Sequence, residues 1–171
     1  MIDQTPKSII SRFYTEIPIT GTNAKILDLG CGFGRNTVFL ARKGFRVDAV
    51  DVSKDTLERL KQNAENQGLL DKITLIHANI ENFHFEEDFA TIICTDVLHF
   101  FNKEKIYDLI NAIKNHTIPR GINIVTVFTT KGDLCSNRMY FFQSQELKNA
   151  YADWEIIFYE ERMKKTLEKD R

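Results

Sequence analysis

Three glycines at alternate positions, Gly30, Gly32 and Gly34, follow a short apolar segment and precede a helix-like segment. Glycine accepts backbone conformations with positive φ and carries no side chain, so a ligand can lie directly against the main chain. In doubly wound α/β proteins, such a turn between a strand and a helix N-terminus holds a nucleotide. The pattern therefore predicts a nucleotide-type cofactor at this turn.

The spacing of these glycines differs from that of a dinucleotide site. The NAD pattern is Gly-x-Gly-x-x-Gly, whereas here the third glycine comes one residue early. Arg35 stands where NAD proteins need glycine for helix–strand packing, and Asp28, before the turn, is not an NAD requirement. Asp51 follows Gly32 by 19 residues, close to the roughly 20 at which an acid holds ribose hydroxyls. We therefore expect Asp51 to bind a ribose, and NAD is disfavoured.

The elements that position these residues alternate between apolar runs and amphipathic segments. Strands are expected at about 24–29, 45–50, 73–78, 89–94, 122–128 and 154–159, and helices at about 7–16, 35–43, 54–67, 103–116 and 145–151. Gly44 predicts a helix end, Ser53 and Ser144 predict helix N-caps, and Pro119-Arg-Gly predicts a turn. Near-continuous apolar strands separated by helices indicate a parallel sheet covered on both faces.

Composition excludes several classes of protein. The chain has 171 residues, is 43% hydrophobic and carries a net charge of −1, so one domain with its own core is expected and no basic surface for nucleic acid. No apolar stretch approaches the ~20 residues of a membrane span, and the first residues do not form a signal peptide. Cys31, Cys94 and Cys135 are widely spaced, which predicts reduced thiols, a cytoplasmic location and no metal site.

The strand and turn around the glycines resemble motif I of class I S-adenosylmethionine (SAM) methyltransferases, which reads Asp-x-Gly-x-Gly-x-Gly, and this resemblance covers about residues 22–130. Residues 27–36, Leu-Asp-Leu-Gly-Cys-Gly-Phe-Gly-Arg-Asn, are similar to the tellurite-resistance methyltransferase family, as are residues 141–147 and 151–157. The resemblance implies one domain over residues 1–171: a Rossmann-like, doubly wound, mostly parallel α/β sheet that binds SAM.

The resemblance also shapes what we expect at the two ends of the chain. The family's fold closes with an antiparallel seventh strand, but the segment after Tyr159 is charged and favours helix or disorder. We therefore expect the final antiparallel strand to be missing and residues 161–171 to form a charged tail. Residues 1–20 are expected to include a lid helix over the site.

The resemblance assigns roles to individual residues. The residues expected to bind the cofactor are Asp28, Gly30, Cys31, Gly32, Arg35, Asn36, Asp51, Val52, Asn79, Ile80, Cys94 and Thr95. Val52 and Ile80 would sandwich the adenine, or form plain core. Asn79 stands where the family usually has an acid, and its oxygen can still accept from the adenine amine. Arg35 either binds the SAM carboxylate or an anionic substrate, or is a solvated arginine at the helix start.

His99 is the candidate catalytic residue, and a packed, structural histidine is an equal alternative. Methyl transfer is an in-line displacement at a carbon that the sulfonium already activates, so the protein chiefly supplies alignment and desolvation. A thiolate, selenite or tellurite needs no strong general base. An alcohol or amine needs one, and His99 would be that base.

We therefore expect a SAM-dependent methyltransferase that releases S-adenosylhomocysteine and acts on a small molecule, with a tellurite- or selenite-like oxyanion as one acceptor. The alternatives are a thiol or hydroxyl metabolite as acceptor, or a SAM-binding module without turnover. The family's later His-Arg segment has no counterpart in residues 163–171, which favours the last alternative. The near-minimal domain argues against nucleic-acid and protein substrates, and the net charge of −1 gives no support for an anionic membrane as a partner.

Overall fold

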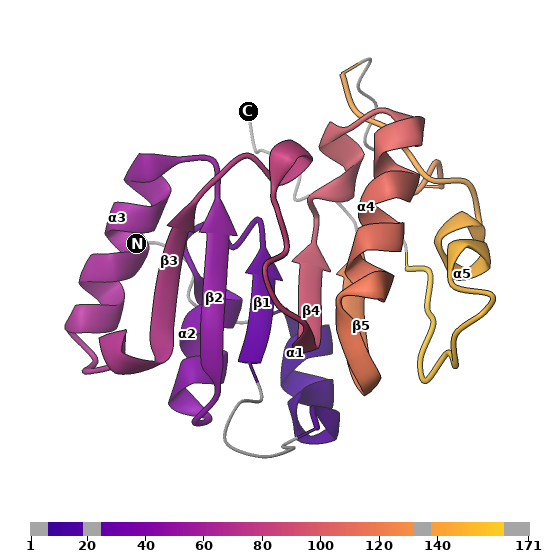
Figure 1. Ribbon diagram of the computed structural model, residues 1–171. Helices are drawn as coiled ribbons and strands as arrows, with labels where there is room; N and C mark the ends of the chain where they lie inside the picture. The colour runs from indigo at the N-terminus through magenta and orange to yellow at the C-terminus, as the bar shows by residue number, and fades with distance from the viewer. Residues whose placement is uncertain (1–6, 19–24, 132–137, 163–171) are drawn as a thin grey trace, which may run out of the picture.

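A computed structural model describes residues 7–18, 25–131 and 138–162 of the chain. Five parallel strands form one sheet in the order β3-β2-β1-β4-β5 (Figure 1). The strands are β1 (Lys25–Leu29), β2 (Arg46–Asp51), β3 (Ile73–His77), β4 (Phe89–Thr95) and β5 (Thr117–Thr126). From β1 the chain adds β2 and β3 on one side of the sheet, and then β4 and β5 on the other side of β1. The direction of strand addition therefore reverses between β1 and β4, and these two strands flank the crevice where such sheets bind ligands.

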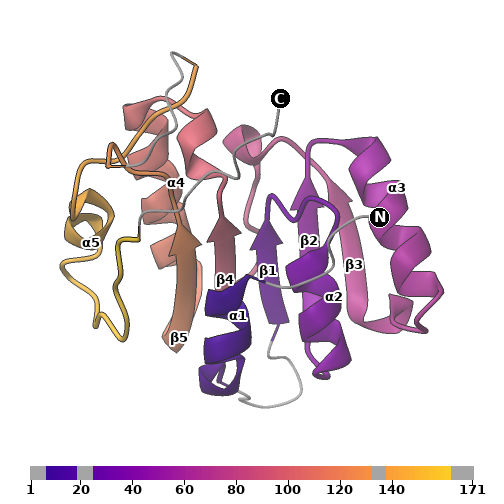
Figure 2. The same ribbon diagram turned by 180° about the vertical axis from the view of Figure 1, so that it is seen from behind.

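Helices cover both faces of the sheet. They are α1 (Ser8–Phe13), α2 (Arg35–Arg42), α3 (Lys54–Glu65), α4 (Lys103–Asn115) and α5 (Glu146–Ala150). Figure 2 shows α1 and α2 on one face, and α3 packs against α2 through Leu60 and Val38 on that side. On the other face, α4 and the segment containing Phe142 and Tyr151 pack over β1 and β4. The expected doubly wound, parallel α/β fold is confirmed.

Local sequence signals account for the boundaries of most elements. Gly44 has φ +96° directly after α2, as expected for a helix-ending glycine. The hydroxyl of Ser53 accepts the amide hydrogen of Thr56 at 3.3 Å, which confirms its prediction as the N-cap of α3. Along β4 every residue is buried, because this central strand has β1 and β5 as neighbours and helices on both faces.

Three expectations in the second half of the chain are corrected. The helix α5 begins after Gln145, which has φ +63°, and Ser144 does not cap it; instead the Ser144 hydroxyl lies 2.9 Å from Lys131 Nζ. The expected Pro119-Arg-Gly turn lies inside β5, where the register with β4 shifts and Arg120 has φ +68°. This segment is therefore an irregularity in an edge strand, where an interruption of the ladder is tolerated.

The strand expected at 154–159 is also absent. Residues 154–162 have no regular secondary structure, and the side chain of Ile157 is 60% exposed. Apolar residues in this segment match the strand pattern, but in the part of the chain that the structure describes no strand pairs with them. Within the described ranges the sheet contains no antiparallel strand and ends at β5; the rest of the expected charged tail, residues 163–171, lies outside the described residues.

The helix expected near the N-terminus is present as α1, followed by a 3-10 turn over Tyr14–Glu16. Ile10 and Ile17 are buried in a cluster with Ile26 of β1 and Leu40 of α2. This packing places α1 on the face of the sheet (Figure 2), and Lys7, which precedes it, contacts Asn36 and Asp96 at the ligand crevice. No helix within the described ranges is long and apolar enough to cross a membrane.

Candidate functional site

The glycine turn lies at the carboxyl end of β1, where its backbone is bonded to β2. The amides of Gly30 and Cys31 both donate to the carbonyl of Val50, at 2.9 and 3.0 Å. All three glycines have positive φ: +71° at Gly30, +54° at Gly32 and +78° at Gly34. Only glycine adopts this run of conformations at low cost, which is why the sequence places glycine at each position.

The three glycines serve different purposes. A Cβ on Gly30 would come within 2.3 Å of Val97, and one on Gly34 within 2.1 Å of Leu60, so both positions need glycine for packing. A Cβ on Gly32 would meet nothing within 4 Å. Gly32 therefore presents bare main chain to open space, which is the arrangement that a ligand lying on the turn requires.

Asp51 ends β2 and faces the same turn. One carboxylate oxygen accepts the amide hydrogen of Gly32 at 2.9 Å, and the other accepts that of Ser53 at 2.9 Å. These bonds hold the carboxylate beside the open face of Gly32. Each oxygen keeps a further lone pair, so the group can still accept hydrogen bonds from a diol.

Asp28 lies under the turn and is 1% exposed. Its carboxylate accepts a hydrogen bond of 2.6 Å from the hydroxyl of Thr37 in the first turns of α2. The pKa of Asp28 is raised to about 6. Burial is the main cause and the nearby Asp51 adds to it, while Thr37 and Arg35 act in the opposite direction. Asp28 therefore orders the start of α2 beneath the turn and changes charge near neutral pH.

A pocket of about 450 Å³ opens beside these residues. The residues that line it are Gly30, Cys31, Gly32, Phe33, Arg35, Asn36, Thr95 and Asp96. The glycine turn and the start of α2 therefore form one wall, and the carboxyl end of β4 forms the other. All of these residues except Phe33 and Asp96 are among those that the sequence predicted for the site.

Asp96 is the functional candidate that sequence analysis missed. It follows Thr95 directly at the end of β4 and has φ +57°. Its carboxylate forms an ion pair with Lys7 and accepts a hydrogen bond of 2.8 Å from Thr126 of β5. An acid directly after a buried strand, at the same sheet edge as Asp51, was the available signal.

Asn36 and Thr95 are both buried and contact each other across the pocket floor. The side-chain amide of Asn36 donates to the Thr95 hydroxyl at 3.2 Å, and its oxygen accepts the amide hydrogen of Lys7 at 2.9 Å. The polar atoms of Asn36 are thus used to join α2, β4 and the segment before α1. Its neighbour Arg35 is half-buried in the pocket wall, where its guanidinium lies near Asp28.

The residues expected at the adenine lie beyond β2. The side chain of Val52 is 64% exposed, whereas Ile80 is 7% exposed and belongs to the core. The Asn79 oxygen accepts the amide hydrogen of Glu81 at 2.9 Å and caps the 3-10 turn Ile80–Asn82. A ligand amine at Asn79 would therefore share an oxygen that already serves as a cap.

His99 is not among the residues that line the pocket. Its ring is 2% exposed and packs between Phe100 and Phe128, with ring centroids 4.1 and 4.6 Å away. Burial lowers the pKa of His99, with Asp96 raising it and Lys7 lowering it. Among the described residues its Nδ1 has no hydrogen-bond partner. The ring is therefore neutral at pH 7 and has an unused polar atom near Asp96.

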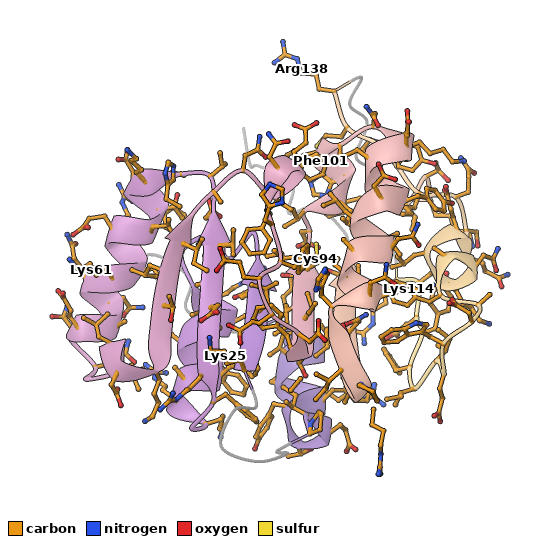
Figure 3. The ribbon with its side chains drawn as sticks, viewed as in Figure 1. Lys25, Lys61, Cys94, Phe101, Lys114 and Arg138 are labelled. Carbon is orange, nitrogen blue, oxygen red and sulfur yellow. The ribbon has the colours of Figure 1, made fainter. Side chains whose placement is uncertain are left out.

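The two cysteines of the site are inert. Cys31 is buried in the pocket wall and Cys94 lies inside β4, within the strand layer (Figure 3). Burial and nearby carboxylates raise the pKa of both thiols, so both stay protonated. Neither can serve as a nucleophile at neutral pH, and both side chains contribute packing.

Comparison with known proteins agrees with this geometry. A family model described as "Tellurite resistance protein TehB" matches residues 15–171. The chain belongs to the TehB family. It is 33% identical over 141 residues to the probable S-adenosyl-L-methionine-dependent methyltransferase TehB of Haemophilus influenzae, a match covering 81% of this chain and 49% of that protein. A second relative, hemagglutinin 1 of Eikenella corrodens, is 34% identical over 139 residues, or 80% of this chain and 46% of that protein.

Solved structures show the same family and fold. The crystal structure of TehB from Haemophilus influenzae superposes with a TM-score of 0.76 at 28% identity, covering 90% of this chain and 52% of that chain. The glycopeptide N-methyltransferase MtfA complexed with SAM superposes with a TM-score of 0.63 at 18% identity, over 74% of this chain and 52% of that one; this likeness concerns the fold alone. The chain spans about half the length of the TehB relatives it matches.

Proposed function

We propose that this TehB-family chain binds SAM and transfers its methyl group to a small-molecule acceptor. The observation that carries the proposal is the open main chain of Gly32 beside the fixed carboxylate of Asp51, on the wall of a 450 Å³ pocket. This arrangement suits a ribose diol at Asp51 and a chain of ligand atoms along the turn. The name of the Haemophilus influenzae relative, a SAM-dependent methyltransferase, supports the same cofactor.

The strand order supports one orientation of the proposed cofactor. Asp51 is on the β2 side of β1, and Thr95 is on the β4 side. With the ribose at Asp51, the adenine would extend toward Val52 and Asn79, and the methionine part toward Gly30 and Thr95. Its ammonium would lie near Asp28, and its carboxylate near Arg35, the cation of the pocket wall.

The protein's part in the reaction would be alignment and exclusion of water, because the sulfonium already activates the methyl group. We propose an anionic nucleophile such as a tellurite- or selenite-like oxyanion, which needs no base; the family description supports it. His99 is buried and neutral, so its proposed role is limited to acceptors that must lose a proton. The free cysteines support a cytoplasmic setting.

Calorimetric titration with S-adenosylhomocysteine tests the cofactor. Wild-type protein should bind it with micromolar affinity, and Asp51→Ala should weaken binding at least roughly tenfold, because a charged acceptor is lost. Asp71→Ala removes an exposed carboxylate on the 3-10 turn Leu70–Lys72 and is the matched control. Absence of binding in the wild type, or equal weakening in both variants, would contradict the proposal.

Turnover tests the acceptor. S-Adenosylhomocysteine formation from SAM would be followed with selenite, tellurite, a small thiol and a small alcohol in parallel. Product with the oxyanions supports the anionic acceptor, and product with the thiol alone replaces it by a thiol metabolite. Binding of S-adenosylhomocysteine without product from any acceptor would mean that the chain is a SAM-binding module.

A further inference from the structure

Lys7 joins the two walls of the pocket. Its backbone amide donates to the Asn36 oxygen at 2.9 Å, and its ammonium forms an ion pair with Asp96. Asn36 in turn donates to Thr95 at 3.2 Å. Lys7, Asn36, Thr95 and Asp96 thus form a closed set of contacts, here called the clasp, between the segment before α1, the start of α2 and the end of β4.

The backbone at Asp96 requires such support. A residue other than glycine at φ +57° is in a sparsely populated conformation, which persists only where the surroundings hold it. The Asp96 amide donates to the carbonyl of Thr126 at 2.9 Å, and the Thr126 hydroxyl donates to the Asp96 carboxylate at 2.8 Å. The ion pair with Lys7 adds a third contact, and it is the one that comes from outside the sheet.

The conformation of Asp96 decides the position of its neighbour Val97. Val97 packs against Gly30 so closely that a Cβ atom added to Gly30 would lie 2.3 Å from the Val97 Cγ2 atom. The turn after β4 and the glycine turn after β1 are therefore interlocked. Any movement of Asp96 would shift Val97 against Gly30, at the point where the cofactor would touch the main chain.

We infer that Lys7 is a positioning residue for the methyl end of the SAM site, acting through Asp96; this inference rests on the proposed function. The clasp lies on the β4 side of β1, across the glycine turn from Asp51. A cofactor anchored by its ribose at Asp51 directs its reactive end toward this wall. Holding the wall still aligns the sulfonium with the acceptor, and small misplacements at this step are costly.

Amide hydrogen exchange tests the clasp directly. Lys7→Gln removes the charge, and Asp96→Asn removes the opposite charge while keeping a residue type that tolerates positive φ. In both variants the amides of Asp96, Phe100 and Cys31 should exchange roughly tenfold faster, because a charge-assisted contact that opposes local opening is lost. Lys7→Arg should restore protection, since it keeps the positive charge.

The double variant shows whether the two residues act together. If Lys7 acts through Asp96, Lys7→Gln with Asp96→Asn should exchange no faster than either single variant. Lys25→Gln is the matched control, because Lys25 pairs with Glu87 at 2.6 Å and begins β1 at the other end of the strand (Figure 3). It should leave the three amides unchanged.

Ligand binding connects the clasp to the site. S-Adenosylhomocysteine affinity should fall roughly tenfold in Lys7→Gln and recover in Lys7→Arg, and kcat with the best acceptor should fall more than KM rises. The inference would be overturned if faster exchange were limited to the amides of α1, or if the effects of the two single variants on exchange added in the double variant. Altered exchange with unchanged S-adenosylhomocysteine affinity would overturn it as well. If the wild type binds no S-adenosylhomocysteine, the proposed function fails, and the exchange measurements still support or overturn the clasp.

Discussion

The hydroxyl of Thr37 donates a hydrogen bond of 2.6 Å to the carboxylate of Asp28, and both side chains are buried under the glycine turn. The hydrogen bonds from Thr37 do not offset the desolvation of the carboxylate, since the pKa of Asp28 still lies at about 6, above its usual 3.8. The folded protein therefore holds a proton on Asp28 that the unfolded chain has already lost between these pH values.

Asp28→Asn should stabilise the protein, and more so at higher pH. The stability that Asp28 contributes is present at low pH and is lost as pH rises through about 6, whereas asparagine stays neutral. The advantage of Asp28→Asn in the free energy of unfolding should be about 1 kcal/mol larger at pH 8 than at pH 5. Urea denaturation at the two pH values measures it. An equal advantage at both pH values would refute the prediction.

Alanine substitutions should separate the glycine that faces a ligand from the glycine that packs. Gly32→Ala should cost about 1 kcal/mol of stability from positive φ alone, yet abolish measurable binding of S-adenosylhomocysteine, because its Cβ would enter the open space. Gly34→Ala should cost about 3 kcal/mol, because its Cβ would also overlap Leu60. Thermal denaturation and calorimetry measure the two effects.

Gly44→Ala serves as the control for these variants. Gly44 has φ +96° with nothing within 4 Å of its Cβ position, and it lies at the end of α2 that is remote from the pocket. It should lose about as much stability as Gly32→Ala while binding S-adenosylhomocysteine normally. Retained binding in Gly32→Ala would show that the ligand does not lie on this main chain.

His99→Leu should reduce the sensitivity of the protein to mild acid. Burial keeps the pKa of His99 below its usual 6.5. As the pH falls, the unfolded chain therefore binds a proton at this residue at a higher pH than the folded protein does. This stability contribution is present above pH 6.5 and is lost as pH falls. The difference in melting temperature between pH 7.5 and 5.5 should therefore be smaller in His99→Leu than in the wild type.

The same variant tests the proposed role of His99 in catalysis. Turnover of an anionic acceptor should persist in His99→Leu, whereas turnover of an alcohol should fall at least roughly a hundredfold, the usual contribution of a general base. Equal loss with both acceptors would assign His99 a structural role.

Phe100→Leu is the control for the acid sensitivity of His99→Leu. Phe100 is adjacent to His99 but 65% exposed, and Phe100→Leu should leave the acid sensitivity unchanged.

Phe142→Ala should destabilise the whole domain. Phe142 is 1% exposed, and its backbone is bonded to Phe128 and Thr130 beyond the end of β5 at 2.9 and 3.0 Å. Truncation of a buried phenylalanine costs about 3–5 kcal/mol, a large share of the stability of a typical domain. Urea denaturation should show one transition at a lower midpoint. A second, early transition would mean that the segment around Phe142 unfolds separately from the sheet.

Much of the site was predictable because short-range rules govern it. The positive φ of Gly32 follows from the residue type, and the position of Asp51 at the end of the next strand follows from its spacing of 19 residues from Gly32. The parallel sheet then brings both residues to one edge, whatever the rest of the chain does. The N-cap at Ser53 was predictable for the same reason, since its bond spans three residues.

Features that depend on a distant partner were not predictable in this way. An apolar run at 154–159 matched a strand, but a strand needs a neighbour to pair with, and none lies beside it in the described residues. Ser144 looked like a helix cap, yet its hydroxyl lies with Lys131 and Glu161. Where local propensity and tertiary contacts favour different conformations, the tertiary contacts decide the conformation that forms.

The sequence by itself determined the fold class, the glycine turn and its partner Asp51, because periodicity, residue type and spacing act within about 30 residues. Only the tertiary structure decided which polar atoms face the pocket. It placed Lys7 against Asp96, 89 residues away, and Val97 against Gly30. It also buried the ring of His99. These arrangements arise from how the strands and helices pack, and no local pattern encodes which side chains then meet.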